Sequence, residues 1–238
     1  MQSDQQAYDR GSTIFSPDGR LYQVEYAREA VNRGSAVVGV RTVEGAVFAA
    51  DSSPRSPLVE SGSIEKLHDL DGRLGVATAG HVADGRRLVE FAREYAQRER
   101  LRYGEAPGVE PVVNALADFV QESTQRGGTR PFGTALLVGG VGEEGSRLFG
   151  LDPSGAPTAW AATALGRDSD EARSHLEAEY EKRLSLDDGT ALAVQALAES
   201  SGDGLSASEV DLATADADGF DVFEESRRAQ ALTDAGLT

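Results

Sequence analysis

Three residues in the first third of the chain carry side chains that could take part in catalysis. Ser35 supplies a hydroxyl, Asp51 a carboxylate and Lys66 an ammonium, at intervals of sixteen and fifteen residues. A serine hydroxyl becomes a useful nucleophile only when a neighbouring group takes its proton and other groups orient it. The three residues are therefore a candidate nucleophilic site, provided that the fold brings them together.

The composition argues against several other kinds of site. The chain has no cysteine, which excludes thiol nucleophiles, disulfides and cysteine-based zinc sites. His68, His81 and His175 do not have the spacing of metal ligands, so we expect no metal and no other cofactor. A net charge of −17 disfavours nucleic-acid binding, which needs a basic face. Because no apolar run reaches about 18 residues, we expect no membrane span.

The basic residues have an unusual distribution. Lys66 and Lys182 are the only lysines, and arginine supplies the remaining positive charge against 40 Asp and Glu residues. Excess carboxylate with little lysine favours a halophilic cytoplasm, where salt screens self-repulsion and carboxylates keep the surface hydrated. An ordinary acidic protein is the alternative. The first thirty residues lack a basic segment followed by an apolar one, so we expect no secretory signal and a cytoplasmic location.

Hydrophobic periodicity and turn residues predict alternating blocks of strands and helices. Strands, two helices, strands, two helices and strands follow one another, which favours an α+β fold of four layers, an α-β-β-α sandwich. We expect one domain over 1–238, with a mobile tail (1–12), an N-terminal helix (20–33), a core (34–224) and a polar C-terminal tail (225–238). The predicted helices are 21–32, 82–102, 109–125, 168–183 and 186–199; the predicted strands are 35–41, 46–50, 64–70, 73–78, 132–141, 147–151, 158–165, 210–215 and 220–224.

Short motifs along nearly the whole chain occur in the order found in one protein family. They are Tyr8-Asp9-Arg10, Ile14-Phe15-Ser16-Pro17-Asp18-Gly19-Arg20-Leu21, Gln23-Val24-Glu25-Tyr26-Ala27, Ile64-Glu65-Lys66, Ala79-Gly80, Ala83-Asp84, Gly127-Gly128, Arg130-Pro131-Phe132-Gly133 and Asp152-Pro153-Ser154-Gly155. This ordered set resembles archaeal proteasome α subunits, and the composition points to a haloarchaeal one. The resemblance implies an N-terminal-nucleophile hydrolase fold of proteasome type. It also implies a seven-membered α ring that caps β rings, whose subunits cut unfolded protein substrates in transit.

The catalytic interpretation of Ser35 remains as an alternative. The similar proteasome β subunits use an N-terminal threonine released by a cut after glycine, and Gly34-Ser35 stands at that place. The alternative is a self-processed N-terminal-serine hydrolase, tuned by Asp51 and Lys66. Such a cut would discard residues 1–34, which carry the strongest α signature. Without the cut, Ser35 has no free amine. Active relatives also carry an aspartate three residues before a late Ser-Gly; Ala198 stands there, before Ser201-Gly202. We therefore expect a vestigial site with no catalytic residue.

The resemblance implies a different role for Lys66. In the family this lysine lines a pocket between neighbouring α subunits, with Gly34 and Gly80, and pairs with the C-terminal carboxylate of an activating AAA+ ATPase. A compact ammonium suits a terminal carboxylate, and glycine allows close approach of a backbone. The simpler interpretations are an internal ion pair for Lys66, a helix cap for Gly34 and a strand end for Gly80. A scaffold that forms rings without docking an ATPase is a third possibility.

Two further groups of residues are implied to control the entry of substrates. Residues that resemble the family's gate cluster are Tyr8, Asp9, Arg10, Pro17 and Tyr26; residues that would form the narrowest turn of the pore are Arg126, Gly127, Gly128 and Thr129. The chain departs from the family pattern at Arg126, where many relatives have tyrosine, at Ser52-Ser53, where a basic residue is usual, and at His81, where an apolar residue is common.

Overall fold

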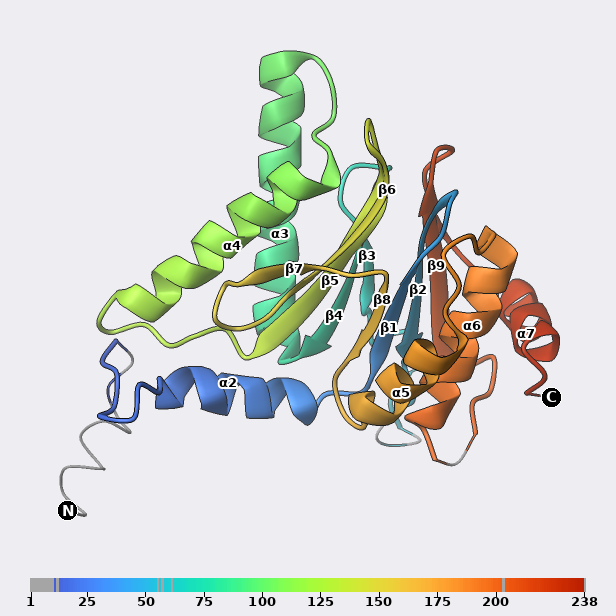
Figure 1. Cartoon of the computed structure of the whole chain (residues 1–238), viewed down its shortest axis with the longest axis horizontal. Coiled ribbons are helices and arrows are strands. Elements are labelled where there is room, and N and C mark those ends of the chain that lie inside the picture. The colour runs from blue at the N-terminus through green and yellow to red at the C-terminus, as the bar shows by residue number, and fades with distance from the viewer. Residues whose placement is uncertain are drawn as a thin grey trace.

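The computed structural model describes residues 11, 13–54, 56, 58–60, 62–202 and 204–237. Two antiparallel sheets lie face to face, with helices on both outer sides (Figure 1). This is the predicted α-β-β-α sandwich. The three predicted gate residues Tyr8, Asp9 and Arg10, and the predicted mobile tail apart from Gly11, lie outside the described residues.

The first sheet has the strand order β10-β9-β2-β1-β8. Its register brings Val37 of β1 opposite Ala50 of β2, and Asp51 of β2 opposite Val210 of β9. Helices α5, α6 and α7 cover its outer face (Figure 1), and their apolar side chains form one core cluster with this sheet. The elements are β1 (Val37–Arg41), β2 (Gly45–Asp51), β8 (Ala162–Leu165), β9 (Val210–Asp216), β10 (Phe220–Val222), α5 (Ser169–Glu179), α6 (Leu186–Glu199) and α7 (Glu225–Asp234).

The second sheet has the strand order β3-β4-β5-β6-β7 and is covered by α3 and α4. A third cluster of alanines, valines, leucines and Phe48 fills the space between the two sheets. Strands β2 and β4 are mostly alanine, valine and glycine and almost fully buried, because each is packed between the other sheet and a helical layer. The elements are β3 (Leu67–Asp69), β4 (Leu74–Gly80), β5 (Thr134–Gly142), β6 (Gly145–Leu151), β7 (Pro157–Ala159), α3 (Val82–Tyr103) and α4 (Val109–Gln125).

Helix α2 (Tyr22–Asn32) corresponds to the predicted N-terminal helix and lies across one end of the sandwich (Figure 1). It packs on the ends of β4 and β5 through Val24, Ala27 and Val31, which repeat at helical spacing and are buried. The connection between α3 and α4 lies at the opposite end of the molecule (Figure 1). The two ends therefore present different surfaces to any neighbour.

The prediction of a single strand over residues 158–165 is wrong. Its first part pairs with β6 as strand β7, and its second part pairs with β1 in the other sheet as strand β8. The chain crosses between the sheets at Trp160, whose N–H donates to Leu148 O at 2.9 Å, and Ala161, whose carbonyl accepts from Arg41 N at 2.8 Å. A run of strand-forming residues does not reveal which sheet each part joins, because pairing is a tertiary property.

The C-terminal segment also differs from the expectation of a polar tail. Residues 225–234 form helix α7, which packs against α6. Ala231, Leu232 and Ala235 are buried at helical spacing. The segment is mostly polar, and these few apolar positions form too weak a pattern to indicate a helix.

Candidate functional site

Ser35 and Lys66 meet at the end of the sandwich on which α2 lies. The Lys66 Nζ donates to the Ser35 backbone carbonyl at 2.9 Å and also to the Ser35 Oγ. Lys66 is only 8% exposed although lysine is rarely buried, while Ser35 is partly exposed. The contact joins residues 31 positions apart, on either side of the β1–β2 hairpin. Two of the three candidate catalytic residues are thus in direct contact.

Asp51 lies in the same corner but has other contacts. Its backbone N–H donates to Ala36 O at 3.0 Å, which places it beside the start of β1. Its carboxylate accepts from Ser53 N at 2.9 Å and lies 3.8 Å from Arg167 Nη2. The Ser52-Ser53 departure therefore has a structural counterpart: a serine amide, rather than a basic side chain, supports this buried carboxylate.

Sequence reasoning missed Asp211 and Arg228 at this corner. Arg228 of α7 donates to Asp211 Oδ1 at 2.8 Å and to Val210 O at 2.9 Å. Burial raises the pKa of Asp211, and the charge of Arg228, the Ser52 hydroxyl and the charge of Lys66 partly oppose this rise. Asp211 neighbours Asp51 across the β2–β9 ladder, where it lies opposite Ala50. Arg228 was missed because it lies in the C-terminal segment, which was interpreted as a polar tail.

The three residues predicted to line a docking pocket also come together. A Cβ atom built on Gly34 would lie 2.5 Å from Gly80 N and 2.9 Å from Gly80 Cα, so the two backbones are in contact. Gly80 has φ of 114°, a conformation that favours glycine, and a Cβ there would lie 2.4 Å from Gly133 O. Both glycines are therefore required by internal packing, whatever else they contact. Lys66 reaches the same place through Ser35.

A carboxylate clamp lies next to Gly80. Asp84, in the first turn of α3, accepts from Arg130 Nη1 at 2.6 Å, from Arg130 Nη2 at 2.8 Å and from Gly133 N at 2.8 Å. Burial opposes ionisation of Asp84, but these hydrogen bonds and the charge of Arg130 outweigh it and hold the pKa below its ordinary value. His81 precedes α3, is exposed, and has Nδ1 3.6 Å from Asp84 Oδ1. The clamp fixes the segment 130–133 against Gly80.

The predicted pore turn follows α4 and is exposed. Gly128 has φ of 87°, and Thr129 Oγ1 donates to Ser123 O at 2.9 Å and to Arg126 O at 2.7 Å. The Arg126 guanidinium lies 3.3 Å from Glu122 one helical turn earlier. The turn is therefore closed by its own hydrogen bonds, and a carboxylate partly offsets the charge of Arg126.

The two predicted gate residues that the structure describes are both exposed. Pro17 lies in a turn closed by a 2.9 Å hydrogen bond from Gly19 N to Ser16 O. Tyr26 is 50% exposed on α2. On the same helix, Arg28 donates to Asp152 Oδ2 at 2.6 and 2.9 Å.

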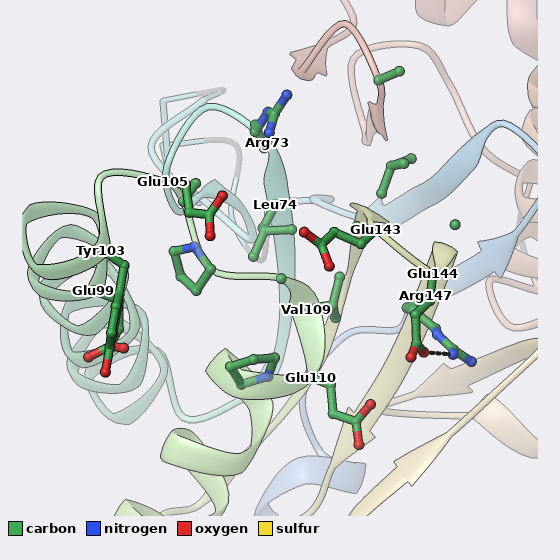
Figure 2. Close-up of a pocket in the computed structure, with 18 of the residues that line it drawn as sticks. Arg73, Leu74, Glu99, Tyr103, Glu105, Val109, Glu110, Glu143, Glu144 and Arg147 are labelled. Atoms are coloured by element: carbon green, nitrogen blue, oxygen red, sulfur yellow. Dashed lines mark hydrogen bonds and ion pairs between the residues drawn. The ribbon is translucent and has the colours of Figure 1, made fainter.

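A pocket of about 870 Å³ lies at the end of the molecule away from α2 (Figures 1 and 2). Residues of the α3–α4 connection and of the β5–β6 and β9–β10 turns line it, and Glu144 pairs there with Arg147. In a chain with 40 carboxylates, an acidic lining is a general property of the surface and does not indicate a ligand. Its carboxylates are Glu99, Glu105, Glu110, Glu143, Glu144 and Asp216.

The described residues hold no group of three or more histidines and carboxylates arranged to bind a metal ion. Within the same part of the chain, no helix has the length and apolarity needed to cross a bilayer.

The sandwich, with Ser35 two residues before β1, has the architecture of an N-terminal-nucleophile hydrolase. Residues 31–215 match the proteasome subunit family, and residues 8–30 match the N-terminal signature of A-type proteasome subunits. The chain therefore belongs to the proteasome subunit family, and within that family to the α subunits.

Individual relatives agree with this assignment over nearly the whole chain. The proteasome alpha 2 subunit of Haloferax volcanii is 54% identical over 98% of this chain and 93% of its own length. The proteasome alpha subunit of Haloquadratum walsbyi is 54% identical over 94% and 89%, and the proteasome alpha 2 subunit of Haloarcula marismortui is 52% identical over 99% and 97%. The resemblance inferred from the ordered motifs is confirmed. The similarity to haloarchaeal proteins agrees with the lysine-poor, acidic composition.

Proposed function

We propose that the chain is a non-catalytic subunit of a seven-membered α ring in a 20S proteasome core particle. The ring would cap β subunits that cut the substrate, admit unfolded protein through its axial pore, and dock an AAA+ ATPase. The observation that carries this proposal is the convergence of Gly34, Gly80 and Lys66 at the end of the sandwich on which α2 lies. The same end carries the exposed Pro17 turn and Tyr26.

The local geometry supports a non-catalytic role for Ser35. Gly34, which precedes Ser35, is held on both sides: its N–H donates to Val31 O at 2.9 Å and its carbonyl accepts from Arg167 N at 2.7 Å. In an uncut chain the nitrogen of Ser35 is a peptide amide, which cannot act as the base that an N-terminal nucleophile uses.

One observation favours the hydrolase alternative, namely the contact between Ser35 Oγ and Lys66 Nζ. The intact mass of the chain, purified in concentrated KCl after co-expression with a β subunit, decides between the two. We expect the full-length mass, apart from methionine loss or acetylation. A mass that begins at Ser35 would establish self-processing and refute the non-catalytic role.

The docking role makes a separate prediction about the two lysines. Lys66→Met should abolish the stimulation of peptide hydrolysis by the ATPase in the assembled α–β particle, because the ammonium that pairs with the ATPase carboxylate is lost. Lys182, which is exposed, provides the matched control. Lys182→Met should retain full stimulation. Equal stimulation of both variants would favour the scaffold that forms rings without docking an ATPase.

The pore turn and the gate belong to the same proposal. Seven copies of Arg126 around one opening would repel one another, an effect that salt screens, and Glu122 at 3.3 Å reduces it within each protomer. Pro17 and Tyr26, with Tyr8, Asp9 and Arg10 outside the described residues, would hold the gate between neighbouring subunits. His81, exposed beside Gly80, would lie at the rim of the docking pocket.

A further inference from the structure

We propose that Ser35 is a direct binding residue for the docked carboxylate and the residue that positions Lys66. In this role the serine and lysine of a nucleophilic site form an anion-binding pair. The inference rests on the proposed docking function. It adds the statement that the ammonium of Lys66 recognises a carboxylate only when the Ser35 hydroxyl holds it.

The first argument concerns the order of the lysine side chain. A free lysine side chain loses rotamer entropy when it is fixed. Here the stem is buried, and the ammonium donates to both the carbonyl and the hydroxyl of Ser35. The entropy is therefore lost during folding and not during docking, which favours binding. Both acceptors are neutral, and the two bonds hold the ammonium at the Ser35 end of the side chain.

The second argument concerns the proton of the serine. A hydroxyl can accept two hydrogen bonds and donate one. The Ser35 Oγ accepts from Lys66, and its own O–H remains able to donate to an anion that approaches the ammonium. A carboxylate has two oxygens that accept such bonds, so the N–H of lysine and the O–H of serine can serve both. Ser35 is partly exposed, whereas Lys66 is buried.

The third argument concerns salt. At about 1 M salt the Debye length is about 3 Å, so an ion pair between exposed groups is largely screened, whereas a buried pair is screened much less. Of the two lysines, Lys182 is exposed and Lys66 is buried. The neighbouring carboxylates have arginine partners: Arg228 contacts Asp211 at 2.8 Å, and Arg167 lies 3.8 Å from Asp51. A buried, anchored ammonium can therefore recognise a carboxylate in a concentrated salt solution.

The test measures binding of a fluorescein-labelled peptide from the C-terminal segment of the regulatory ATPase to the assembled α–β particle. The peptide is made with a free carboxylate and, as a control, with a C-terminal carboxamide. Ser35→Ala should weaken the carboxylate peptide about tenfold, the loss expected for a hydrogen bond to a charged group. It should leave the carboxamide peptide unchanged. Ser35→Thr, which keeps the hydroxyl, should bind the carboxylate peptide like the parent.

Two further variants separate the possible failures. In the Lys66→Met background, Ser35→Ala should cause only a small further loss, because the two side chains act together. Ser174→Ala, at an exposed serine of α5 whose hydroxyl donates along its own helix to Asp170 O at 2.9 Å, controls for the loss of a hydroxyl. An effect of Lys66→Met without any effect of Ser35→Ala would overturn the inference and leave docking intact, and so would equal weakening of both peptides. No effect of Lys66→Met would refute docking itself.

Discussion

The clamp between Asp84 and Arg130 makes a quantitative prediction about stability. Asp84 accepts three hydrogen bonds, of which Oδ2 takes those from Gly133 N and Arg130 Nη1, and Oδ1 takes that from Arg130 Nη2. In Asp84→Asn the remaining carbonyl oxygen can serve the first two donors. The new amide NH2 then faces Arg130 Nη2, so one charge-assisted bond becomes a donor–donor contact.

The expected loss follows from this geometry. A hydrogen bond to a charged group contributes about 1.5–3 kcal/mol, but the Arg130 side chain is 62% exposed, so solvent reduces its share. We expect Asp84→Asn to lower the free energy of unfolding by about 2 kcal/mol. For a chain of this size that corresponds to a Tm lower by about 4–8 °C. Asp118→Asn, at an exposed position of α4, is the matched control and should change the Tm little.

The pH dependence tests the cause. The folded pKa of Asp84 lies below its ordinary value of 3.8, so its ionised form stabilises the fold at every pH above the unfolded pKa. The contribution disappears as the pH falls through the folded pKa. The difference between Asp84→Asn and the parent should thus be present at about pH 5 and shrink below about pH 4. Thermal unfolding in KCl at one protein concentration, followed by the fluorescence of Trp160, measures it. Equal Tm values at about pH 5, or a difference that does not shrink below about pH 4, would refute the reasoning.

Three other substitutions test the rest of the structure. Gly34→Ala should destabilise the fold by about 3 kcal/mol or more in thermal unfolding, because its Cβ would meet the Gly80 backbone at 2.5 Å; parent-like stability would show that the two backbones do not touch. Leu232→Ala should cost about 2–5 kcal/mol and release hydrogen-exchange protection in α7, since Leu232 is 1% exposed; unchanged protection would contradict the packing of α7 on α6. Arg126→Tyr should flatten the salt dependence of peptide entry, because it removes the charges at the pore turn; equal salt slopes for variant and parent would remove this role.

The elements with strong periodicity could be predicted from the sequence. The predicted bounds 109–125 and 186–199 are those of α4 and α6, because apolar residues repeat at helical spacing, Gly127 lies just beyond the first helix and Ser185 caps the start of the second. The order of the elements then limits the layers to two sheets with helices outside. The crossover at Trp160 could not be predicted, since both halves of the run 158–165 have strand-forming sequences and only pairing assigns them to different sheets.

Part of the candidate site could also be predicted, from the family motifs and not from periodicity. Lys66 and Gly80 stand in the ordered motifs, Gly34 and Ser35 were placed by the resemblance that those motifs carry, and the fold brings the four together. The pairing of the charged residues around them was not predicted: Asp84 bonds with Arg130 across 46 positions, and Arg228 with Asp211 across 17. Charged pairs at such separations leave no periodic signal in a single sequence.

The contact between Ser35 and Lys66 raises the question of whether Ser35 only stabilises the buried lysine or also binds a ligand. A buried ammonium must have hydrogen-bond acceptors, because its desolvation otherwise costs several kcal/mol. The carbonyl of Ser35 would meet part of this need with any residue at that position, whereas the second bond needs the hydroxyl. If Ser35 were only inherited from an enzyme, replacing it with alanine would affect stability alone. If Ser35 binds the docked carboxylate, the loss of peptide affinity in Ser35→Ala must depend on whether the peptide carries a C-terminal negative charge. That dependence would show that Ser35 has a binding role beyond stability.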